Sequence, residues 1–210
     1  MRRLVISGVM MLMSSGLALA EPVDGATARK MLFSPKGVDL QVIEDSGLSK
    51  AQLTILDALL KGMNANGLAN YYGAVAVSPT FFDQVAKDPG QAALAGLLQV
   101  TERLHTPAAA ATLAMRACQK ARKSRDGACV LAARIMPKKW TPQPVSMGVG
   151  ATEAFRDYLK GKGPKAIAIS ANSGSYAIAK GEGAAEKAMT TCNASAAKSG
   201  KPDCSVVIAD

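Results

Sequence analysis

Aromatic residues and histidine are scarce in this chain. Tryptophan, tyrosine and phenylalanine make up 4% of its 210 residues, and His105 is the single histidine. A Ser-His-Asp triad would have to use this residue, which comes directly before Thr106-Pro107 at a predicted strand-to-helix junction. A lone histidine at such a junction is typically a surface or capping residue. We therefore predict no catalytic residue here.

The chain also lacks a transmembrane segment after its first twenty residues. Those twenty begin with Arg2 and Arg3, continue with an apolar run from Leu4 to Met13 and end in Ala18-Leu19-Ala20, the pattern of a secretory signal peptide. An uncleaved anchor is the alternative, but this run is too short to cross about 30 Å of hydrocarbon as a helix. We expect cleavage near Ala20, with the mature chain in the periplasm or secreted.

Phosphate-binding and metal-binding motifs are missing as well. No Walker sequence or G-x-G-x-x-G follows a predicted strand, and the segment 161–163 with its two glycines reads as a turn. The four cysteines lack the C-x-x-C spacing of zinc and thioredoxin-like sites. We expect no cofactor and no metal, and interpret the cysteines as structural disulfides.

What the chain does contain is one pattern that occurs twice, from Tyr72 to Arg134 and from Pro164 to Ala209. Each copy has a strand that alternates alanine with β-branched residues, an alanine-rich helix with a methionine three residues before a cysteine, and a second cysteine that opens another strand. The pattern pairs Cys118 with Cys129 and Cys192 with Cys204. Such pairs form in oxidising compartments, which agrees with export.

These elements predict an α+β fold of two disulfide-bonded β-β-α-β repeats with an N-terminal helix/strand/helix extension, the two sheets pairing about a pseudo-two-fold axis. The expected boundaries are a signal peptide at 1–20, the extension at 21–66, repeat 1 at 67–137 with an insertion at 80–96, a linker with a short helix at 138–163, and repeat 2 at 164–210. The insertion, which contains Phe81 and Phe82, is expected on the surface with a short helix of its own.

Local signals refine this picture. Residues 38–42 alternate apolar and polar side chains, which is typical of a half-buried strand. Ser49 and Gln52 form a capping box at the start of a helix. The alternating strands have one alanine face and one bulky face, and the alanine face should let an alanine-rich helix approach closely. We expect the alanine, methionine and cysteine of each helix, Met115 and Met189 included, to point into the core.

Basic residues are in excess. Removal of Arg2 and Arg3 would leave 23 basic against 16 acidic residues, so the formal charge would fall from +9 to +7. The predicted cationic patch consists of Lys120, Arg122, Lys123, Arg125, Lys138, Lys139 and an exposed Trp140. Such a patch could hold an anionic polymer or a membrane surface. The alternative is solvated charge, because cations also favour a helix C-terminus.

The second copy resembles a family of small secreted bacterial domains of unknown function. The resemblance rests on Ala166-Ile167-Ala168-Ile169-Ser170, the turn Ser173-Gly174-Ser175-Tyr176, the helix with Cys192 and the strand Asp203-Cys204-Ser205-Val206-Val207. The first copy looks like a diverged member, and the resemblance implies no catalytic residues.

The whole chain is similar to short exported proteobacterial proteins, some of which carry the name 5-aminolevulinate synthase. A synthase of that type needs a Schiff-base lysine and an aspartate for the pyridinium of pyridoxal phosphate. No segment of this chain matches that arrangement.

Three hypotheses for function follow. The first is a non-enzymatic, envelope-associated interaction module whose partner is an anionic envelope polymer or another protein, nucleic acid being the less expected anion. The second is a small-ligand carrier or enzyme that uses a cleft between the repeats. The third is an inhibitor of a partner enzyme that uses the insertion at 80–96 as its contact loop.

Overall fold

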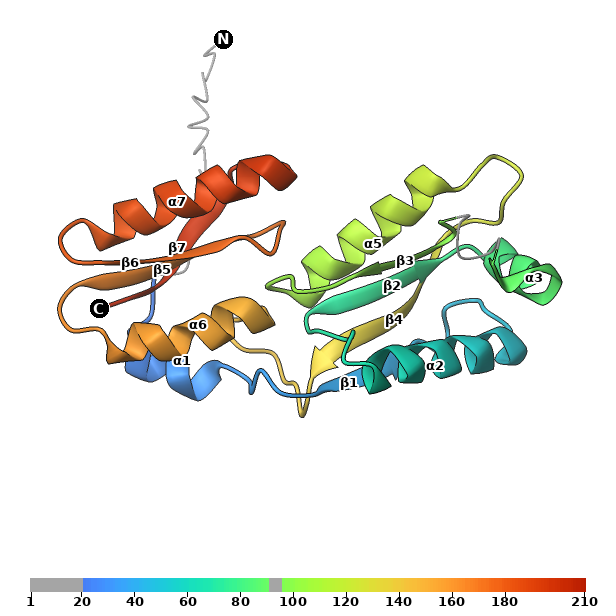
Figure 1. Ribbon diagram of the computed structural model, residues 1–210, viewed down its shortest axis with the longest axis horizontal. Coiled ribbons are helices and arrows are strands. Elements are labelled where there is room, and N and C mark those ends of the chain that lie inside the picture. The colour runs from blue at the N-terminus through green and yellow to red at the C-terminus, as the bar shows by residue number, and fades with distance from the viewer. Residues whose placement is uncertain (1–20, 91–95) are drawn as a thin grey trace, which may run out of the picture.

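The computed structural model describes residues 21–90 and 96–210, and within them the chain forms two halves arranged end to end (Figure 1). The strands are β1 (Val38–Val42), β2 (Gly73–Val77), β3 (Leu98–Thr101), β4 (Val130–Pro137), β5 (Lys165–Ser170), β6 (Tyr176–Lys180) and β7 (Cys204–Ala209). The helices are α1 (Gly25–Met31), α2 (Lys50–Ala65), α3 (Thr80–Lys87), α5 (Pro107–Ala121), α6 (Val149–Lys160) and α7 (Ala184–Ser199).

Each half contains an antiparallel sheet, with the order β1-β4-β2-β3 in the first and β6-β5-β7 in the second. In both halves a central strand, β2 or β5, pairs with the next strand along the chain and with the strand that follows the long helix. Both central strands also have an irregularity at the same step, Val75/Ala76 and Ile167/Ala168. The predicted α+β class with two disulfide-bonded β-β-α-β units is confirmed.

Both predicted disulfides are present. Cys118 bonds to Cys129 and Cys192 bonds to Cys204, with Cα–Cα distances of 6.1 and 6.0 Å. One bond joins α5 to the segment that leads into β4, and the other joins α7 to the first residue of β7. Each bond therefore fixes the long helix of its half to the strand that follows it.

The two faces of each sheet differ as the alternation predicts. On one face the alanines of the central strand pack under the alanine stripe of the long helix, as Ala74 and Ala76 do under α5 and Ala166 and Ala168 under α7. Alanine side chains permit this close approach because they project little from the sheet. Helices α5 and α7 thus cover equivalent faces of the two halves (Figure 1).

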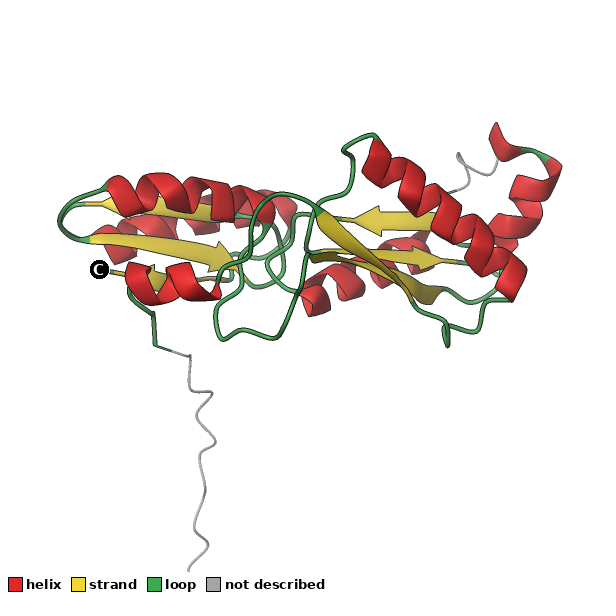
Figure 2. Ribbon diagram, turned by 90° about the horizontal axis from the view of Figure 1, so that it is seen from below, coloured by secondary structure: helices red, strands yellow, loops and turns green. Residues whose placement is uncertain are grey.

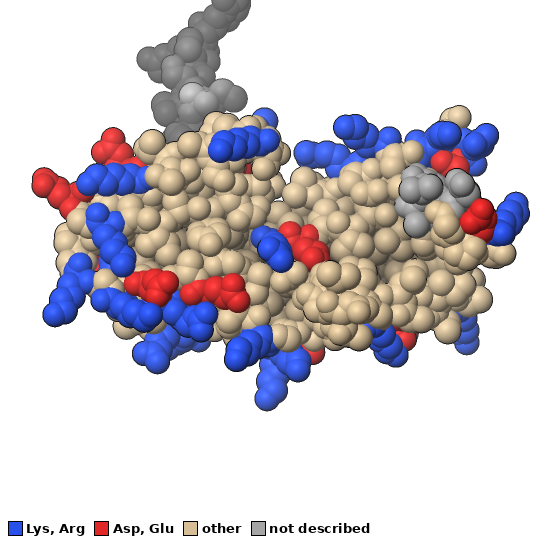
Figure 3. Space-filling view, in the orientation of Figure 1, with Lys and Arg blue, Asp and Glu red and all other residues tan. Residues whose placement is uncertain are grey.

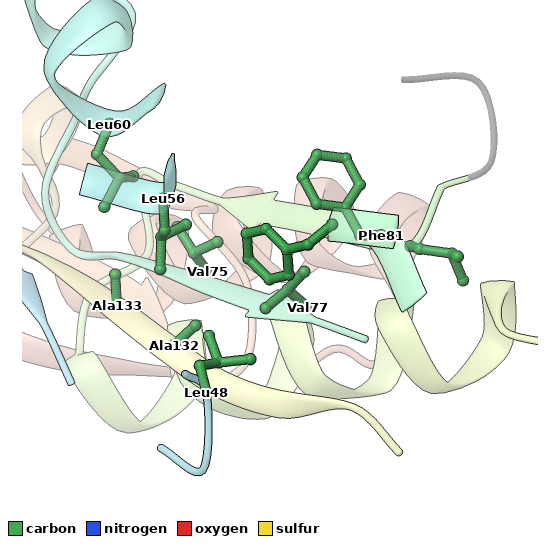
Figure 4. Close-up of a cluster of buried hydrophobic side chains, with 10 residues drawn as sticks. Leu48, Leu56, Leu60, Val75, Val77, Phe81, Ala132 and Ala133 are labelled. Atoms are coloured by element: carbon green, nitrogen blue, oxygen red, sulfur yellow. The ribbon is translucent and has the colours of Figure 1, made fainter. Parts of the chain in front are cut away.

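The opposite faces carry the bulky side chains. In the first half Val75 and Val77 pack against Leu56 and Leu60 of α2 (Figure 4). In the second half the isoleucines of β5 pack against α1 and α6, including Phe155. Each half is therefore a three-layer arrangement with a sheet between helices.

One core assignment was wrong. Met189 is 37% exposed, whereas Ala188 and Cys192 of the same helix are fully buried. The buried positions of α7 follow the spacing of Ala184, Ala188, Cys192 and Ala196. A residue one position after this stripe is rotated by about 100° around the helix axis and faces solvent. The equivalent Met115 is partly buried against the core of the first half.

The segment before β2 contributes to both halves. Val23 forms a parallel bridge with Ile208 beside β7, and α1 packs on the second half. The chain then crosses to the first half, where β1 pairs antiparallel with β4. The predicted capping box at the start of α2 is present, since Ser49 Oγ accepts the Gln52 N–H (3.3 Å) and Gln52 Oε1 accepts the Ser49 N–H (2.9 Å).

The insertion of the first half begins with the expected short helix, α3. Phe81 and Phe82 of this helix are 7% and 4% exposed and belong to the core of the first half. The insertion is thus anchored by its aromatic residues and is not a purely surface excursion. Residues 91–95 of the insertion, and residues 1–20 with the predicted signal peptide, lie outside the described residues.

The two sheets do not pair with each other, contrary to expectation. The halves meet through loops at the ends of their strands (Figure 2). The loop after β3 contacts the loop between β5 and β6. No described strand of one sheet is a hydrogen-bonded neighbour of a strand of the other. Across residues 21–90 and 96–210, no helix is long and apolar enough to span a membrane.

Candidate ligand-binding cleft

The residues of the predicted cationic patch occupy two separate places. Lys120 lies in the last turn of α5, and Arg122, Lys123 and Arg125 lie between α5 and β4. Lys138, Lys139 and Trp140 follow the other end of β4. The eight residues of β4 place these groups roughly 25 Å apart, at about 3.3 Å per residue. The prediction of one continuous patch is therefore wrong, because strand β4 separates its two parts.

Several of these residues shape turns. The Arg122 guanidinium donates to the Asp126 carbonyl (3.3 Å), and the Lys123 N–H donates to the Asp126 carboxylate (2.6 Å). The Lys139 N–H donates in the same way to the Asp39 carboxylate (3.0 Å). The backbone of Lys123 and of Lys139 and the side chain of Arg122 thus take part in local turns.

Trp140 is partly buried and packs against the cluster that contains Tyr71 and Tyr72, so it is not the exposed ring that we expected. Over the face shown in Figure 3, basic and acidic side chains are mixed along the rim. A single basic field is not visible on that face.

His105 occupies an unexpected position, since it is 1% exposed and lies where the halves meet. Its Nδ1 accepts the N–H of Gly148 (3.0 Å), and its Nε2 lies 3.0 Å from the carbonyl oxygen of Ser175. Because Nδ1 is an acceptor, the proton is on Nε2, which donates to Ser175. The capping role belongs to Thr106, whose hydroxyl accepts the Ala109 N–H (3.1 Å).

Burial lowers the pKa of His105, although its bonds to Ser175 and Gly174 and the charge of Asp203 act in the opposite direction. The ring is therefore neutral and both of its nitrogens are engaged. A general base needs a free nitrogen within reach of a substrate proton. His105 has none, which supports a structural role.

Two glycines let the halves approach closely around His105. A Cβ on Gly174 would lie 2.6 Å from the carbonyl oxygen of Arg103, and a Cβ on Gly148 would overlap the carbonyl oxygen of Leu104. Both oxygens belong to backbone that cannot move aside without shifting the loop. Any side chain at either glycine would push the halves apart.

The loop between β5 and β6 is held by a polar network. The Ser170 hydroxyl, fully buried, donates to the Asp203 carboxylate and accepts the N–H of Ser173 (2.9 Å) and of Asn172 (3.3 Å). The other oxygen of Asp203 accepts the side-chain amide of Asn172 (2.6 Å). In the first half the equivalent Ser78 donates to the Gly127 carbonyl (2.7 Å). The loop is thus fixed to the segment before β7.

A cleft of about 220 Å³ lies between the halves, directly beside this loop. One wall is α5, another is the loop between β5 and β6, and the third is the end of α7. Its lining residues are Ala109, Thr112, Leu113, Arg116, Ser170, Asn172, Ser173, Ser199, Gly200 and Lys201. The two charged residues are both cationic, and the remaining polar groups are hydroxyls and one amide.

Arg116 and Lys201 are both exposed, and among the described residues neither belongs to an ion pair. The two largest of the described hollows contain acidic residues in their linings. The hollow of about 690 Å³ near α1 contains the acidic Asp24 and Asp210 together with basic residues, and the one of about 670 Å³ beside α2 contains Glu44 and Asp57 with Lys50. The inter-half cleft combines two cations with hydroxyls and has no carboxylate in its lining, whereas the hollow of about 330 Å³ beside Trp140 also lacks a carboxylate but contains one cation, Arg134, and no hydroxyl.

A second hollow continues from the cleft. It shares Ser199 and is lined by Glu102, Arg103, Gly174, Ser175, Tyr176 and Ser195. The half-buried Tyr176 provides an aromatic surface there, with its ring perpendicular to His105 at 6.5 Å between centroids. Both hollows are thus lined by residues of the loop between β5 and β6.

The sequence alone did not single out the residues of this cleft. Thr112 and Arg116 are four residues apart on the exposed side of α5, a spacing that places them on one helix face. This spacing can be found in the sequence, but it does not indicate that Lys201 and Ser173, which belong to the other half, lie nearby. Only the contact between the halves brings these groups together.

Among the residues that the structure describes, no cluster of histidine, cysteine, aspartate and glutamate could hold a metal ion. Comparison of the chain with protein-family models, with curated proteins and with solved structures found no match to any of them.

Proposed function

We propose that the protein is an exported, non-enzymatic binding module that holds an acidic saccharide polymer of the cell envelope in its inter-half cleft. The observation that carries this proposal is the convergence of Arg116 and Lys201 with hydroxyl groups in a cleft without an acidic lining residue. Guanidinium and ammonium groups recognise carboxylates or phosphates, and hydroxyls bond to sugar oxygens.

The size of the cleft supports a short acidic segment as its occupant. A volume of about 220 Å³ is below the range of about 300 to 1,000 Å³ that is usual for pockets of drug-sized ligands. The neighbouring hollow with Tyr176 offers room for the next units of a chain. A polymer could therefore place one acidic unit in the cleft and continue along the loop.

Export is part of the same proposal. Two disulfide bonds are characteristic of oxidising compartments, and the signal-like pattern of residues 1–20 agrees with such a location. The engaged nitrogens of His105 favour binding over acid-base catalysis. The equivalent strand order and disulfides of the halves support their origin in a duplicated unit.

Calorimetric titration with a galacturonate oligomer tests this function, with a neutral galactose oligomer of the same length as the control ligand. We expect the acidic oligomer alone to bind, with an affinity that falls roughly tenfold between about 50 and 200 mM salt because two cations are involved. Arg116→Gln and Lys201→Gln should each weaken binding strongly.

The matched controls are Lys120→Gln and Arg125→Gln, which remove the same charge outside the cleft and should leave the affinity unchanged. Equal losses from the control and cleft variants would assign binding to overall charge and reject the cleft as the site. Absence of binding to the galacturonate oligomer would reject the proposed function.

A further inference from the structure

The single histidine joins the two halves next to the elements that line the cleft. His105 comes from the loop that leads into α5, and its ring bonds to Ser175 in the loop between β5 and β6 and to Gly148 just before α6. Its own carbonyl oxygen accepts the hydroxyl of Ser146 (2.7 Å). Helix α5 and the loop between β5 and β6 form two walls of the cleft. The ring therefore sets the distance between those walls.

These bonds require one protonation state. A neutral ring with its proton on Nε2 donates to Ser175 and accepts from Gly148. A second proton on Nδ1 would face the Gly148 N–H at a separation of 3.0 Å between the nitrogens. Two donors cannot bond to each other, so protonation removes one bond and leaves a buried charge at the junction.

The acidic residues near the His105 ring already have other hydrogen-bond partners. In the segment before β7, Asp203 is the acid whose charge acts on His105, but its carboxylate already accepts bonds from Ser170 and Asn172. On the loop of His105 itself, the Glu102 carboxylate accepts the N–H of Asn70 (3.0 Å).

The remaining neighbours offer no carboxylate to a charged ring. Arg103 lines the adjacent hollow, and Tyr176 of β6 presents its ring. The segment 146–148 before α6 contains no titratable residue. No described carboxylate hydrogen-bonds to the imidazole.

We propose that protonation of His105 breaks the junction between the halves and opens the inter-half cleft, so that mild acid releases a ligand held there. The opening itself depends on the fold alone, whereas the release of a ligand rests on the proposed function. The direction follows from linkage: the open state has an ordinary histidine pKa near 6.5, above that of the closed state. The open population should increase up to tenfold for each pH unit below about 6.5.

Because the chain has one histidine, NMR of the disulfide-bonded protein reports on this ring without ambiguity. At neutral pH we expect the ¹⁵N signals of a bare Nδ1 and a protonated Nε2. On acidification, the hydrogen-exchange protection factor of the Gly148 amide should fall by up to tenfold per pH unit. Amides of β2 and β5 should keep their protection, which would separate opening from unfolding.

The variant His105→Gln keeps an acceptor and a donor but cannot titrate in this range. We expect its Gly148 protection factor to be independent of pH between about 7 and 5. Binding of the galacturonate oligomer should weaken on acidification in the natural protein and not in the variant.

A ring that becomes doubly protonated while Gly148 keeps its protection would overturn the proposal, and so would an equal pH dependence in His105→Gln. If that variant does not fold, the pH titration of the ring and of the Gly148 amide in the natural protein still tests the proposal. If galacturonate fails to bind at any pH, the proposed function fails, and the Gly148 measurement still tests the junction.

Discussion

Lys165 and Asp210 are paired twice, through their backbones and through their side chains. Each backbone N–H donates to the carbonyl oxygen of the other residue at 3.0 Å, and Lys165 Nζ lies 3.2 Å from Asp210 Oδ2. The second carboxylate oxygen accepts the N–H of Gly25 (2.8 Å). This arrangement fixes the start of α1 to one end of the β5/β7 pair, where β5 begins and β7 ends.

The variant Asp210→Asn should destabilise the second half by about 1 kcal/mol, since the carboxylate is partly exposed and its charged bonds are screened. The bond from Gly25, followed by that from Lys165, holds the pKa of Asp210 below its ordinary value. The stabilisation is thus complete above the ordinary pKa near 3.8 and is lost as the pH falls through the lower folded value.

Urea unfolding at neutral pH and near pH 3 measures this effect. The difference between Asp210→Asn and the natural protein should shrink at the lower pH. Asp157→Asn is the control, because the Asp157 carboxylate is exposed and its pair with Lys160 is exposed as well, so the midpoint should not change. A midpoint of Asp210→Asn that equals the natural one at neutral pH would contradict the prediction.

The close approach at Gly174 can be tested by Gly174→Ala. The added Cβ would meet the Arg103 carbonyl at 2.6 Å, so the junction must widen, with a cost of about 1 to 3 kcal/mol. We expect reduced protection of the Gly148 amide and a lower thermal midpoint. Gly62→Ala is the matched control, since its Cβ would have no neighbour within 4 Å and alanine should stabilise α2 by about 0.5 to 1 kcal/mol. Equal midpoints for the two variants would show that the approach does not constrain the junction.

The packing of alanines between each long helix and its sheet should allow no larger side chain at the buried positions. Ala188→Leu should lower the free energy of unfolding by about 1 to 3 kcal/mol, because this fully buried residue lies between α7 and the sheet. Ala185→Leu adds the same side chain at an exposed position of the same helix and should change stability little. Chemical unfolding of both variants makes the comparison, and a tolerant Ala188 would indicate that α7 can move away from the sheet.

Both disulfides should contribute similar stability, since their sequence separations are 11 and 12 residues. Closing a loop of this size contributes about 3 kcal/mol in the chain-entropy model. Two double variants test this, one in which Cys118 and Cys129 are both replaced by alanine and one in which Cys192 and Cys204 are both replaced. The two variants should shift the urea midpoint to a similar extent. A loss in one half much smaller than in the other would conflict with equivalent roles.

Much of each half could be predicted because its signals are local and periodic. Alternation along Ala166–Ser170 identified both the strand and its two different faces, and Ser49 with Gln52 marked a helix start. The exposure of Met189 escaped prediction because one position of helical rotation decides it. Buried Phe81 and Phe82 depend on where the insertion folds back, which no local pattern encodes.

By itself, the sequence determined the composition of each half: alternating strands, an alanine-packed helix and a cysteine pair at a fixed spacing. Those properties follow from the periods of strand and helix and from short loops. The tertiary structure alone decided that the halves meet through strand-end loops, with His105 bonded to residues 43 and 70 positions away. Contacts at such separations depend on how two complete surfaces fit together, and the cleft with Arg116 and Lys201 exists only as a result of that fit.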